Sequence, residues 1–298
     1  MQNIDKFISM KIRQWVFPGL IALFIIFILN TFFFTIVSVP SADMRATLFE
    51  KDIIFINKFN CDYKRNDILA FKYYADDSLQ KTPQHVFIQR CIGLPGDSIK
   101  MDSGNVFINK MPEATSQNLQ FNFHLKSKGT LDTNILTRYK ITEGGIVSDE
   151  NDYSFSLTQN MADSLKQNDF ILEIKKNIET NEIWDKEIFP HSNKFKWNKH
   201  NMSGFVIPKK NEVLTLDTGN IWLYYKLISE YENNKLEVRA DSILINDAKV
   251  SSYKVIKNYY FVMGDNRDNA FDSRYWGFLP ENYVIGKMSF VILNGRKR

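Results

Sequence analysis

One uncharged apolar stretch near the N-terminus constrains this chain more than any other feature. No charged residue lies between Arg13 and Asp43, and Trp15–Val39 is rich in Ile, Leu and Phe. About 20 apolar residues suffice to cross the hydrocarbon core of a bilayer, so the sequence predicts a transmembrane helix over residues 15–39. A cleavable signal sequence is the alternative, but its apolar region is usually shorter, roughly 7–15 residues, and ends in small residues. Because this stretch runs into Phe32–Phe34, we expect an uncleaved anchor.

Basic residues before the apolar stretch set its expected orientation. Lys6, Lys11 and Arg13 lie within the short range over which positive charge keeps a flanking segment in the cytoplasm. We therefore expect a single-pass protein of the cytoplasmic (inner) membrane with its N-terminus in the cytoplasm. The soluble part, from about Pro40 onward, is expected in the periplasm or another extracytoplasmic space.

The composition favours a mainly β fold. Hydrophobic residues make up 44% of the chain and charged residues 24%, which permits a buried core. Aromatic residues make up 14%, and this richness in Phe and Tyr is typical of strands. The net charge of +4 is small, and no basic stripe or stacking motif accompanies it, so we expect no nucleic-acid partner.

Short apolar runs separated by turn residues predict an antiparallel β protein. Leu94–Asp97 and Asp102–Asn105 have the composition of tight turns between strands. The predicted strands are Asp52–Lys58, Asp67–Tyr74, His85–Cys91, Ser98–Met101, Val106–Ile108, Lys235–Val238, Ser242–Ile245, Tyr259–Met263 and Val284–Leu293.

The middle of the chain differs in composition from the segments on either side. Pro112–Leu214 is more polar and weakly periodic, which predicts an inserted subdomain with β and some helical content. Thr158–Gln167 is a possible short helix, and Asp217–Tyr231 is a stronger one with Asp217 or Thr218 as its cap. The expected organisation is a cytoplasmic N-terminus (1–14), a transmembrane helix (15–39), a β core in two parts (40–111 and 235–298) and an inserted α+β subdomain (112–234).

Three segments carry long motifs. In chain order they are VPSADMRATL at Val39–Leu48, FIQRCIGLPGD at Phe87–Asp97 and GDNRDNAFDSRYWG at Gly264–Gly277. They resemble the signature boxes of type I signal peptidase, the bacterial leader peptidase family, whose patterns are P-S-x-S-M-x-P-T-L, I-K-R-x-I-G-L-P-G-D and G-D-N-R-x-x-S-x-D-S-R-x-W-G. GFVIPKK at Gly204–Lys210 is similar to the longer members found in Bacteroidetes-type bacteria. The resemblance implies a signal-peptidase-like antiparallel β core.

The resemblance also implies a reaction whose chemical groups this chain lacks. The family cleaves signal peptides with a serine nucleophile and a lysine general base, which is held by a second serine. These positions fall on Asp43, Gln89 and Ala270, and the proline of the first box falls on Ala46. The chain therefore resembles a divergent member of the family without its catalytic dyad.

Other residues are poor substitutes for the missing dyad. Attack by the Asp43 carboxylate would give an anhydride, and the Gln89 amide has no titratable proton with which to act as a base. Ser41 is expected on the same face as Asp43 but without a base in reach, and a paired Asp43 and Asp272 is a minor alternative. We expect instead that the Gln89 amide donates a hydrogen bond to the Asp43 carboxylate.

The peptide-binding apparatus of the family is retained. The resemblance implies that the end of a signal peptide adds as a strand between about Phe34–Pro40 and Val86–Gln89, through backbone hydrogen bonds and small pockets. The candidate substrate-binding residues are Pro40, Ser41, Met44, Val86 and Ile88. The residues expected to support the site, through an Arg/Asp ion-pair network and the turn of the third box, are Arg90, Gly264, Asp265, Asp272, Ser273 and Arg274.

Three functions fit these observations. The favoured one is a non-catalytic homologue that binds signal peptides, preproteins, or an active peptidase or secretion partner. The second is an active signal peptidase with a rearranged site, and the third is a structural accessory that makes its contacts through Pro112–Leu214. No cofactor or metal is expected, because the His and Cys residues show no ligand spacing and no nucleotide loop is present. Cys61 and Cys91 either pair in an oxidising compartment or leave Cys91 as a buried thiol.

Overall fold

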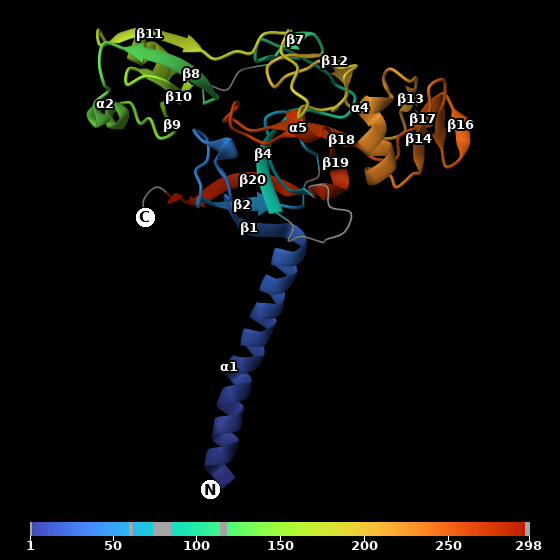
Figure 1. Ribbon diagram of the computed structural model, residues 1–298. Coiled ribbons are helices and arrows are strands. Elements are labelled where there is room, and N and C mark those ends of the chain that lie inside the picture. Colours follow the sequence, from blue (N-terminus) through green and yellow to red (C-terminus); the bar gives the residue numbers. More distant parts are fainter. Residues whose placement is uncertain (1, 60–61, 74–84, 114–117, 296–298) are drawn as a thin grey trace.

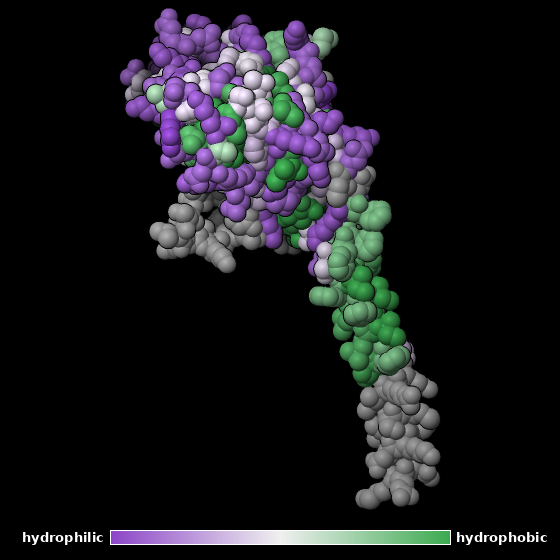
Figure 2. Space-filling model, turned by 90° about the vertical axis from the view of Figure 1, so that its right-hand side faces the viewer, coloured by the Kyte–Doolittle hydropathy of each residue, from purple (hydrophilic) through white to green (hydrophobic). Residues whose placement is uncertain are grey.

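A long helix projects from a body of antiparallel sheets (Figure 1). The computed structural model describes residues 2–59, 62–73, 85–113 and 118–295. Helix α1 (Gln2–Ile28) continues as the π-helix η1 (Leu29–Phe33), and Trp15–Phe33 is long and apolar enough to cross a membrane. No part of this span is buried by the rest of the protein, and Figure 2 shows its apolar surface.

The predicted transmembrane helix is too long at its C-terminal end. Phe34–Ser38 forms strand β1, which pairs with β2 (Ile53–Asn57). This segment contains Thr, Ile and Val in succession, and such β-branched residues favour an extended backbone when a partner strand is available. The anchor therefore passes into the main sheet without a linker.

The main sheet brings the three motifs together. Its seven strands follow the order β1-β2-β20-β3-β4-β18-β19, and neighbouring strands pair in the antiparallel direction. The remaining strands are β3 (Ile68–Tyr73), β4 (His85–Gly93), β18 (Tyr259–Met263), β19 (Leu279–Pro280) and β20 (Val284–Leu293). Because β4 lies between β3 and β18, the second motif adjoins the strand that leads into the third.

Alternate residues of β3 are buried on opposite faces of this sheet. Leu69 and Phe71 pack in one hydrophobic cluster, with Trp276 of the third motif. Ala70 packs in another cluster, with Met44 and Leu48 of the first motif. The period of two in a β-strand thus fixes the first and third motifs against the same strands.

Two four-stranded sheets lie on the side of the body away from the anchor (Figure 1). One has the order β12-β5-β6-β7 and the other β11-β8-β10-β9. Their strands are β5 (Ser98–Asp102), β6 (Asn105–Ile108), β7 (Met111–Pro112), β8 (Gln120–Ser127), β9 (Gly144–Ile146), β10 (Asp152–Thr158), β11 (Ile171–Lys176) and β12 (Met202–Val206). Strand β12 comes from the predicted insertion, yet it pairs with β5, so this segment contributes to the same packing unit as the first part of the core.

Small sheets and short helices complete the described fold. The small sheets contain β13 (Val213–Thr215) and β17 (Ser252–Lys254), and β14 (Leu236–Val238), β15 (Ile243–Ile245) and β16 (Ala248–Val250). The helices are α2 (Thr133–Arg138), α3 (Gln159–Lys166), α4 (Ile221–Lys226), α5 (Ser273–Trp276), the π-helix η3 (Leu227–Tyr231), and the 3-10 turns η2 (Ala42–Met44) and η4 (Glu281–Tyr283).

The two helices predicted from the sequence differ in outcome. Helix α3 is confirmed, and the Thr158 hydroxyl caps it by accepting the N–H of Met161. The second helix begins at Ile221, so the predicted cap is wrong. Asp217 accepts the backbone N–H groups of Gly219 and Asn220 and holds a turn before the helix starts.

The predicted strands are confirmed over the described residues, with ends that move by one or two residues. Tyr74 and Cys61 lie outside the described residues. Cys91 is a free thiol that is fully buried in the sheet, and burial raises its pKa well above the usual range. This thiol is therefore protonated and unreactive in the folded protein.

Candidate functional site

Asp43 lies in the short turn η2 that follows β1. The side chains of Met44 and Leu48, both 1% exposed, hold the turn by packing in one hydrophobic cluster. Asn266 holds the backbone of the turn through two hydrogen bonds. Its backbone N–H donates to the Asp43 carbonyl at 2.9 Å, and its side-chain amide donates to the Ala42 carbonyl at 3.3 Å. The third motif thus positions the backbone of the first.

Gln89 faces Asp43 from strand β4. Its side chain is fully buried, and Nε2 donates to Asp43 Oδ2 at 3.2 Å and to the Phe271 carbonyl at 2.9 Å. The hydrogen bond expected between Gln89 and Asp43 is therefore present. Gln89 Oε1 is buried without a hydrogen-bond partner among the described residues, which is an unfavourable position for an amide oxygen.

Burial makes the Asp43 carboxyl a weaker acid than an ordinary aspartate. Removal from water, with a smaller contribution from the nearby Asp272 charge, raises its pKa to about 6, against hydrogen bonds from Gln89 and Ser41 that lower it. A hydrogen bond from Ser41 is thus one of the influences on this carboxyl. No base was expected within reach of Ser41, and the η2 turn brings the Asp43 carboxyl near it.

Gly264 allows the first and third motifs to approach closely. A β-carbon on Gly264 would lie 2.3 Å from Ala270 Cβ and 2.5 Å from the Asp43 carbonyl oxygen. Neither distance is tolerated between non-bonded atoms, so this position requires glycine. Ala270 is 3% exposed. The absence of a side chain at Gly264 lets Ala270 lie beside the Asp43 backbone.

Two Arg/Asp pairs lie around these residues. Arg90 donates to both carboxylate oxygens of the fully buried Asp265, from Nε at 2.7 Å and from a terminal nitrogen at 2.6 Å. Arg274 binds the carboxylate of Asp272 in the same bidentate manner, at 2.8 Å from each nitrogen. Such paired, planar contacts fix the orientation of both partners.

The support residues of the third motif also hold backbone groups. The Asp272 carboxylate accepts the Gly264 N–H at 3.0 Å, and the Ser273 hydroxyl accepts the Val262 N–H at 3.0 Å. Since both oxygens of Asp272 are engaged by Arg274 and Gly264, its carboxylate is committed to this network. An acid pair of Asp43 with Asp272 therefore has no support in these contacts.

Comparison with known proteins identifies the family. The profile described as "Signal peptidase, peptidase S26" matches residues 12–293. The chain belongs to this family. It is 28% identical over 293 residues to a signal peptidase I of Buchnera aphidicola subsp. Baizongia pistaciae, an alignment that covers 92% of this chain and 74% of that protein. It is 26% identical over 262 residues to a signal peptidase I of Aquifex aeolicus, covering 87% and 75%.

A solved structure is also similar to the chain. A crystal structure of a signal peptidase I from Enterococcus faecalis V583 matches 76% of this chain and 97% of that one, at 16% identity and a TM-score of 0.27. The family assignment itself rests on the profile match.

The candidate peptide-binding residues of this signal peptidase homologue differ in accessibility. Met44 and Ile88 are 1% and 2% exposed and pack in one hydrophobic cluster with Val39. Pro40 is exposed and Val86 is half-buried, so these two present surface to solvent.

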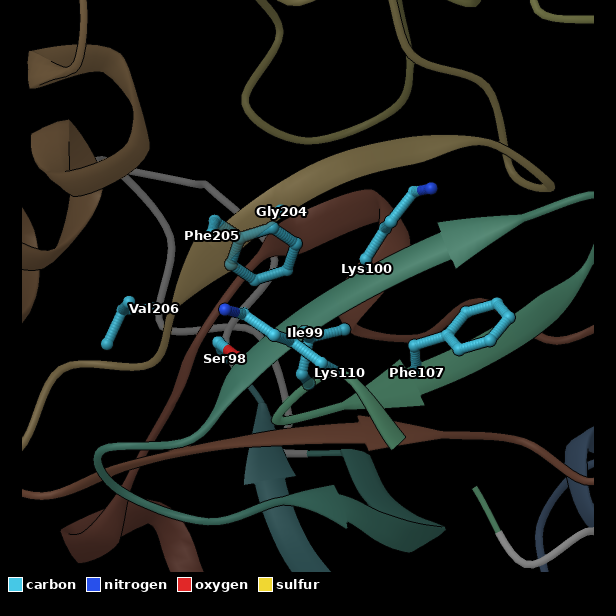
Figure 3. A pocket seen from close by; sticks show the side chains of 8 residues that line it. All are labelled: Ser98, Ile99, Lys100, Phe107, Lys110, Gly204, Phe205 and Val206. Atoms are coloured by element: carbon cyan, nitrogen blue, oxygen red, sulfur yellow. The ribbon is translucent and has the colours of Figure 1, made fainter. Parts of the chain in front are cut away.

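A separate hollow of about 490 Å³ lies over β5, β6 and β12 (Figure 3). Its lining residues are Ser98, Ile99, Lys100, Phe107, Lys110, Gly204, Phe205 and Val206. None of the residues predicted from the family boxes is among them, so this hollow is distinct from the candidate site.

Two residues of the site were missed from the sequence. Asn266 lies inside the third motif, where the G-D-N-R pattern was a usable signal, yet only its neighbours were singled out. Glu143 lies in the predicted insertion, accepts the Asn266 side-chain amide at 2.9 Å and contacts Arg45 at 3.3 Å. No local pattern marks Glu143, because its role arises only when the chain folds back onto the core.

The raised pKa of Asp43 predicts a pH-dependent effect of Asp43→Asn on stability. Protonation of Asp43 favours the folded state, so its contribution is greatest below the unfolded value of 3.8 and is lost as pH rises through about 6. At pH 7.5 the buried carboxylate is a net cost. Because asparagine still accepts from Gln89, Asp43→Asn is expected to raise the free energy of unfolding by about 1–3 kcal/mol at pH 7.5.

Urea unfolding at two pH values checks this prediction. The stabilisation is expected to be smaller at pH 5, where the folded protein already holds the proton. Asp241→Asn, at an exposed position, is the matched control and is expected to change little at either pH. Destabilisation by Asp43→Asn at pH 7.5 would contradict this account of the buried carboxyl.

Proposed function

We propose that this protein is a catalytically inactive signal peptidase I homologue that binds signal peptides or preproteins at the outer face of the cytoplasmic membrane. The observation that carries the proposal is the contact between Gln89 and Asp43. The family's base position holds a buried amide that already donates to Asp43 and to the Phe271 carbonyl. An amide cannot accept a proton from a nucleophile near neutral pH, and a carboxylate is a poor nucleophile for amide cleavage.

Unpaired strand edges beside the cleft support peptide binding. Strand β18 pairs with β4 only at Arg90, Cys91 and Gly93. The backbone of Val86–Ile88 therefore has a strand partner on one side only, β3, among the described residues. Strand β1 is likewise at an edge of the main sheet. An extended peptide placed between these edges would gain backbone hydrogen bonds without any catalytic group.

Aromatic residues at the end of the anchor support a position at the bilayer surface. Phe34, Phe55 and Phe290 stack in a row across β1, β2 and β20, with ring centroids 5.1 and 5.0 Å apart. Phe59 is 74% exposed and stacks on Phe33 at the end of the membrane-spanning helix. Exposed apolar surface continuous with an anchor is expected to contact lipid. The basic residues before the span favour an orientation in which the soluble part lies outside the cytoplasm.

A binding and cleavage assay on the purified, detergent-solubilised chain tests the proposal. A fluorescent preprotein is expected to bind with an affinity that falls when its signal peptide is deleted, and to remain intact during the incubation. A preprotein that neither binds nor is cut would remove the binding function and favour the accessory role, with contacts through residues 112–214.

The second candidate is an active signal peptidase with a rearranged site, and one observation favours it. A hydrogen bond from Ser41 is among the influences on the pKa of the Asp43 carboxyl, and a pKa of about 6 allows this carboxylate to accept a proton near neutral pH. If Ser41 were the nucleophile and Asp43 its base, cleavage would rise between pH 5 and 7. It would then be lost in both Ser41→Ala and Asp43→Asn. We expect no such cleavage, and Ser41→Ala is expected to leave preprotein binding within about twofold, a change of less than 0.5 kcal/mol.

A further inference from the structure

A second cavity lies away from the candidate site, between the two four-stranded sheets on the far side of the body. Its volume is about 410 Å³, and it is enclosed by β6, β7, β8, helix α3 and the end of β11. One lining residue, Arg267, belongs to the third motif, and it was not among the residues predicted for the candidate site.

Arg267 has an unsatisfied donor in this cavity. The residue is 3% exposed, and its Nε has no hydrogen-bond partner among the described residues. A terminal nitrogen contacts Glu113 Oε2 at the long distance of 3.4 Å. The backbone is fixed because the Arg267 N–H donates to the Gln120 carbonyl at 2.8 Å. A buried guanidinium N–H is unfavourable without an acceptor, so the site is incomplete as described.

Lys176 brings a second positive charge to the same cavity. Its Nζ lies 3.1 Å from the centroid of the Phe121 ring, a cation–π contact. Burial, with a smaller contribution from the Arg267 charge, lowers the pKa of Lys176 to about 8, against the charge of Asp268, which raises it. Asp268 is already engaged, since it accepts from His200 at 2.6 Å and from the Asn122 N–H at 2.6 Å.

The cavity therefore combines an excess of positive charge with apolar walls. Among the described residues, two cations and one carboxylate, Glu113, line it. The walls include Val106, Phe107, Leu119 and Phe121, with amide side chains at Asn105 and Asn160. An excess of one charge suits a monoanion, and the aromatic walls suit a flat or branched apolar body.

We propose that this cavity binds a carboxylate carried on an apolar body, with the anion held between Arg267 Nε and Lys176 Nζ. The carboxylate can belong to a free small acid or to the C-terminus of a peptide that ends in an apolar residue. This site is independent of the proposed function, because neither Asp43 nor Gln89 lines the cavity.

Calorimetric titration of the detergent-solubilised full chain tests the charge requirement. Benzoate is expected to bind with one-to-one stoichiometry, and its neutral analogue benzamide at least about tenfold more weakly, because a charge-assisted hydrogen bond is lost. N-acetyl-Ala-Leu and its C-terminal amide form the second arm, which distinguishes a peptide terminus from a free acid. Equal binding of acid and amide in both pairs, or binding of neither acid, would overturn the proposal.

Adjacent lysines provide a matched pair of variants. Lys176→Met is expected to weaken benzoate binding about tenfold or more. Lys175 precedes Lys176 in β11 and pairs with Glu173 outside the cavity. Lys175→Met therefore removes the same charge and is expected to leave benzoate binding unchanged. Equal effects of the two substitutions would mean that the affinity for benzoate depends on the overall charge of the protein and that benzoate does not bind in this cavity.

Amine labelling gives a readout on the unmodified protein, should a variant fail to fold. Lys176 is expected to react with acetic anhydride at pH 8 and to be protected by benzoate, as followed by mass spectrometry of the labelled peptides. Lys175 serves as the internal reference and is expected to react equally with and without benzoate. Labelling of Lys176 that benzoate leaves unchanged would overturn the assignment.

Discussion

The triple variant Asp43→Ser, Gln89→Lys and Ala270→Ser is expected to cleave preproteins, whereas the parent protein is expected to leave them intact. The groups would enter a site whose backbone is already positioned. Gln89 Nε2 lies 3.2 Å from the Asp43 carboxylate, so a lysine amine at position 89 would come within hydrogen-bond reach of a serine hydroxyl at position 43. Full burial disfavours the ammonium form of such a lysine and makes it a base. Since a positioned base contributes about 10²–10⁴-fold, cleavage should rise at least about a hundredfold over the parent protein.

Partial variants are the controls for this result. Gln89→Lys alone keeps Asp43 and is expected to form a buried ion pair without any cleavage. Asp43→Ser alone has a hydroxyl but no base, and is also expected to be inert. The rate of preprotein cleavage at pH 8 is the measurement. Cleavage by the parent protein at the rate of the triple variant would refute the proposed inactivity, and a folded, peptide-binding triple variant without cleavage would show that more than these groups has been lost.

Removal of the Asp265 carboxylate is expected to cause the largest loss of stability among the site residues. Asp265 is fully buried and accepts two hydrogen bonds from Arg90 and one from Thr47. Asp265→Ala leaves the mostly buried Arg90 guanidinium without its partner. Breaking a buried pair in this way costs about 3–5 kcal/mol. Urea unfolding, followed by tryptophan fluorescence, measures the change.

The matched control is a pair on the surface of β5. Asp102 pairs with Lys100 at 3.1 Å, with both side chains about half exposed. Because solvent screens such a pair, Asp102→Ala is expected to change the free energy of unfolding little. If Asp265→Ala were as mild as Asp102→Ala, the Arg90 pair would not be what holds the third motif against the strands.

The parts of the site that the sequence predicted are those fixed by local patterns. The motifs identified Asp43, Gln89 and Ala270, and the family resemblance, which places residues 43 and 89 at the catalytic pair, led to the predicted hydrogen bond. Strand positions followed from runs of apolar residues between turns. Motifs and strands both depend on residues that are close in sequence, where the geometry of a strand is regular.

The parts that failed depend on contacts between distant segments. Hydropathy cannot distinguish the end of an apolar helix from an apolar strand, so the strand Phe34–Ser38 was assigned to the anchor. A cap was expected at Asp217, which instead holds a separate turn. Glu143 reaches the site from the far sheet, and the contact of Ser41 with Asp43 depends on a 3-10 turn that no pattern announces.

The direct passage of the anchor into β1 makes the chain a molecular ruler. Roughly ten residues separate Phe33, the end of the apolar span, from Asp43, so the cleft cannot lie more than about 33 Å above the end of that span. The candidate site is therefore held close to the end of the apolar span, within the reach of a short extended segment of chain.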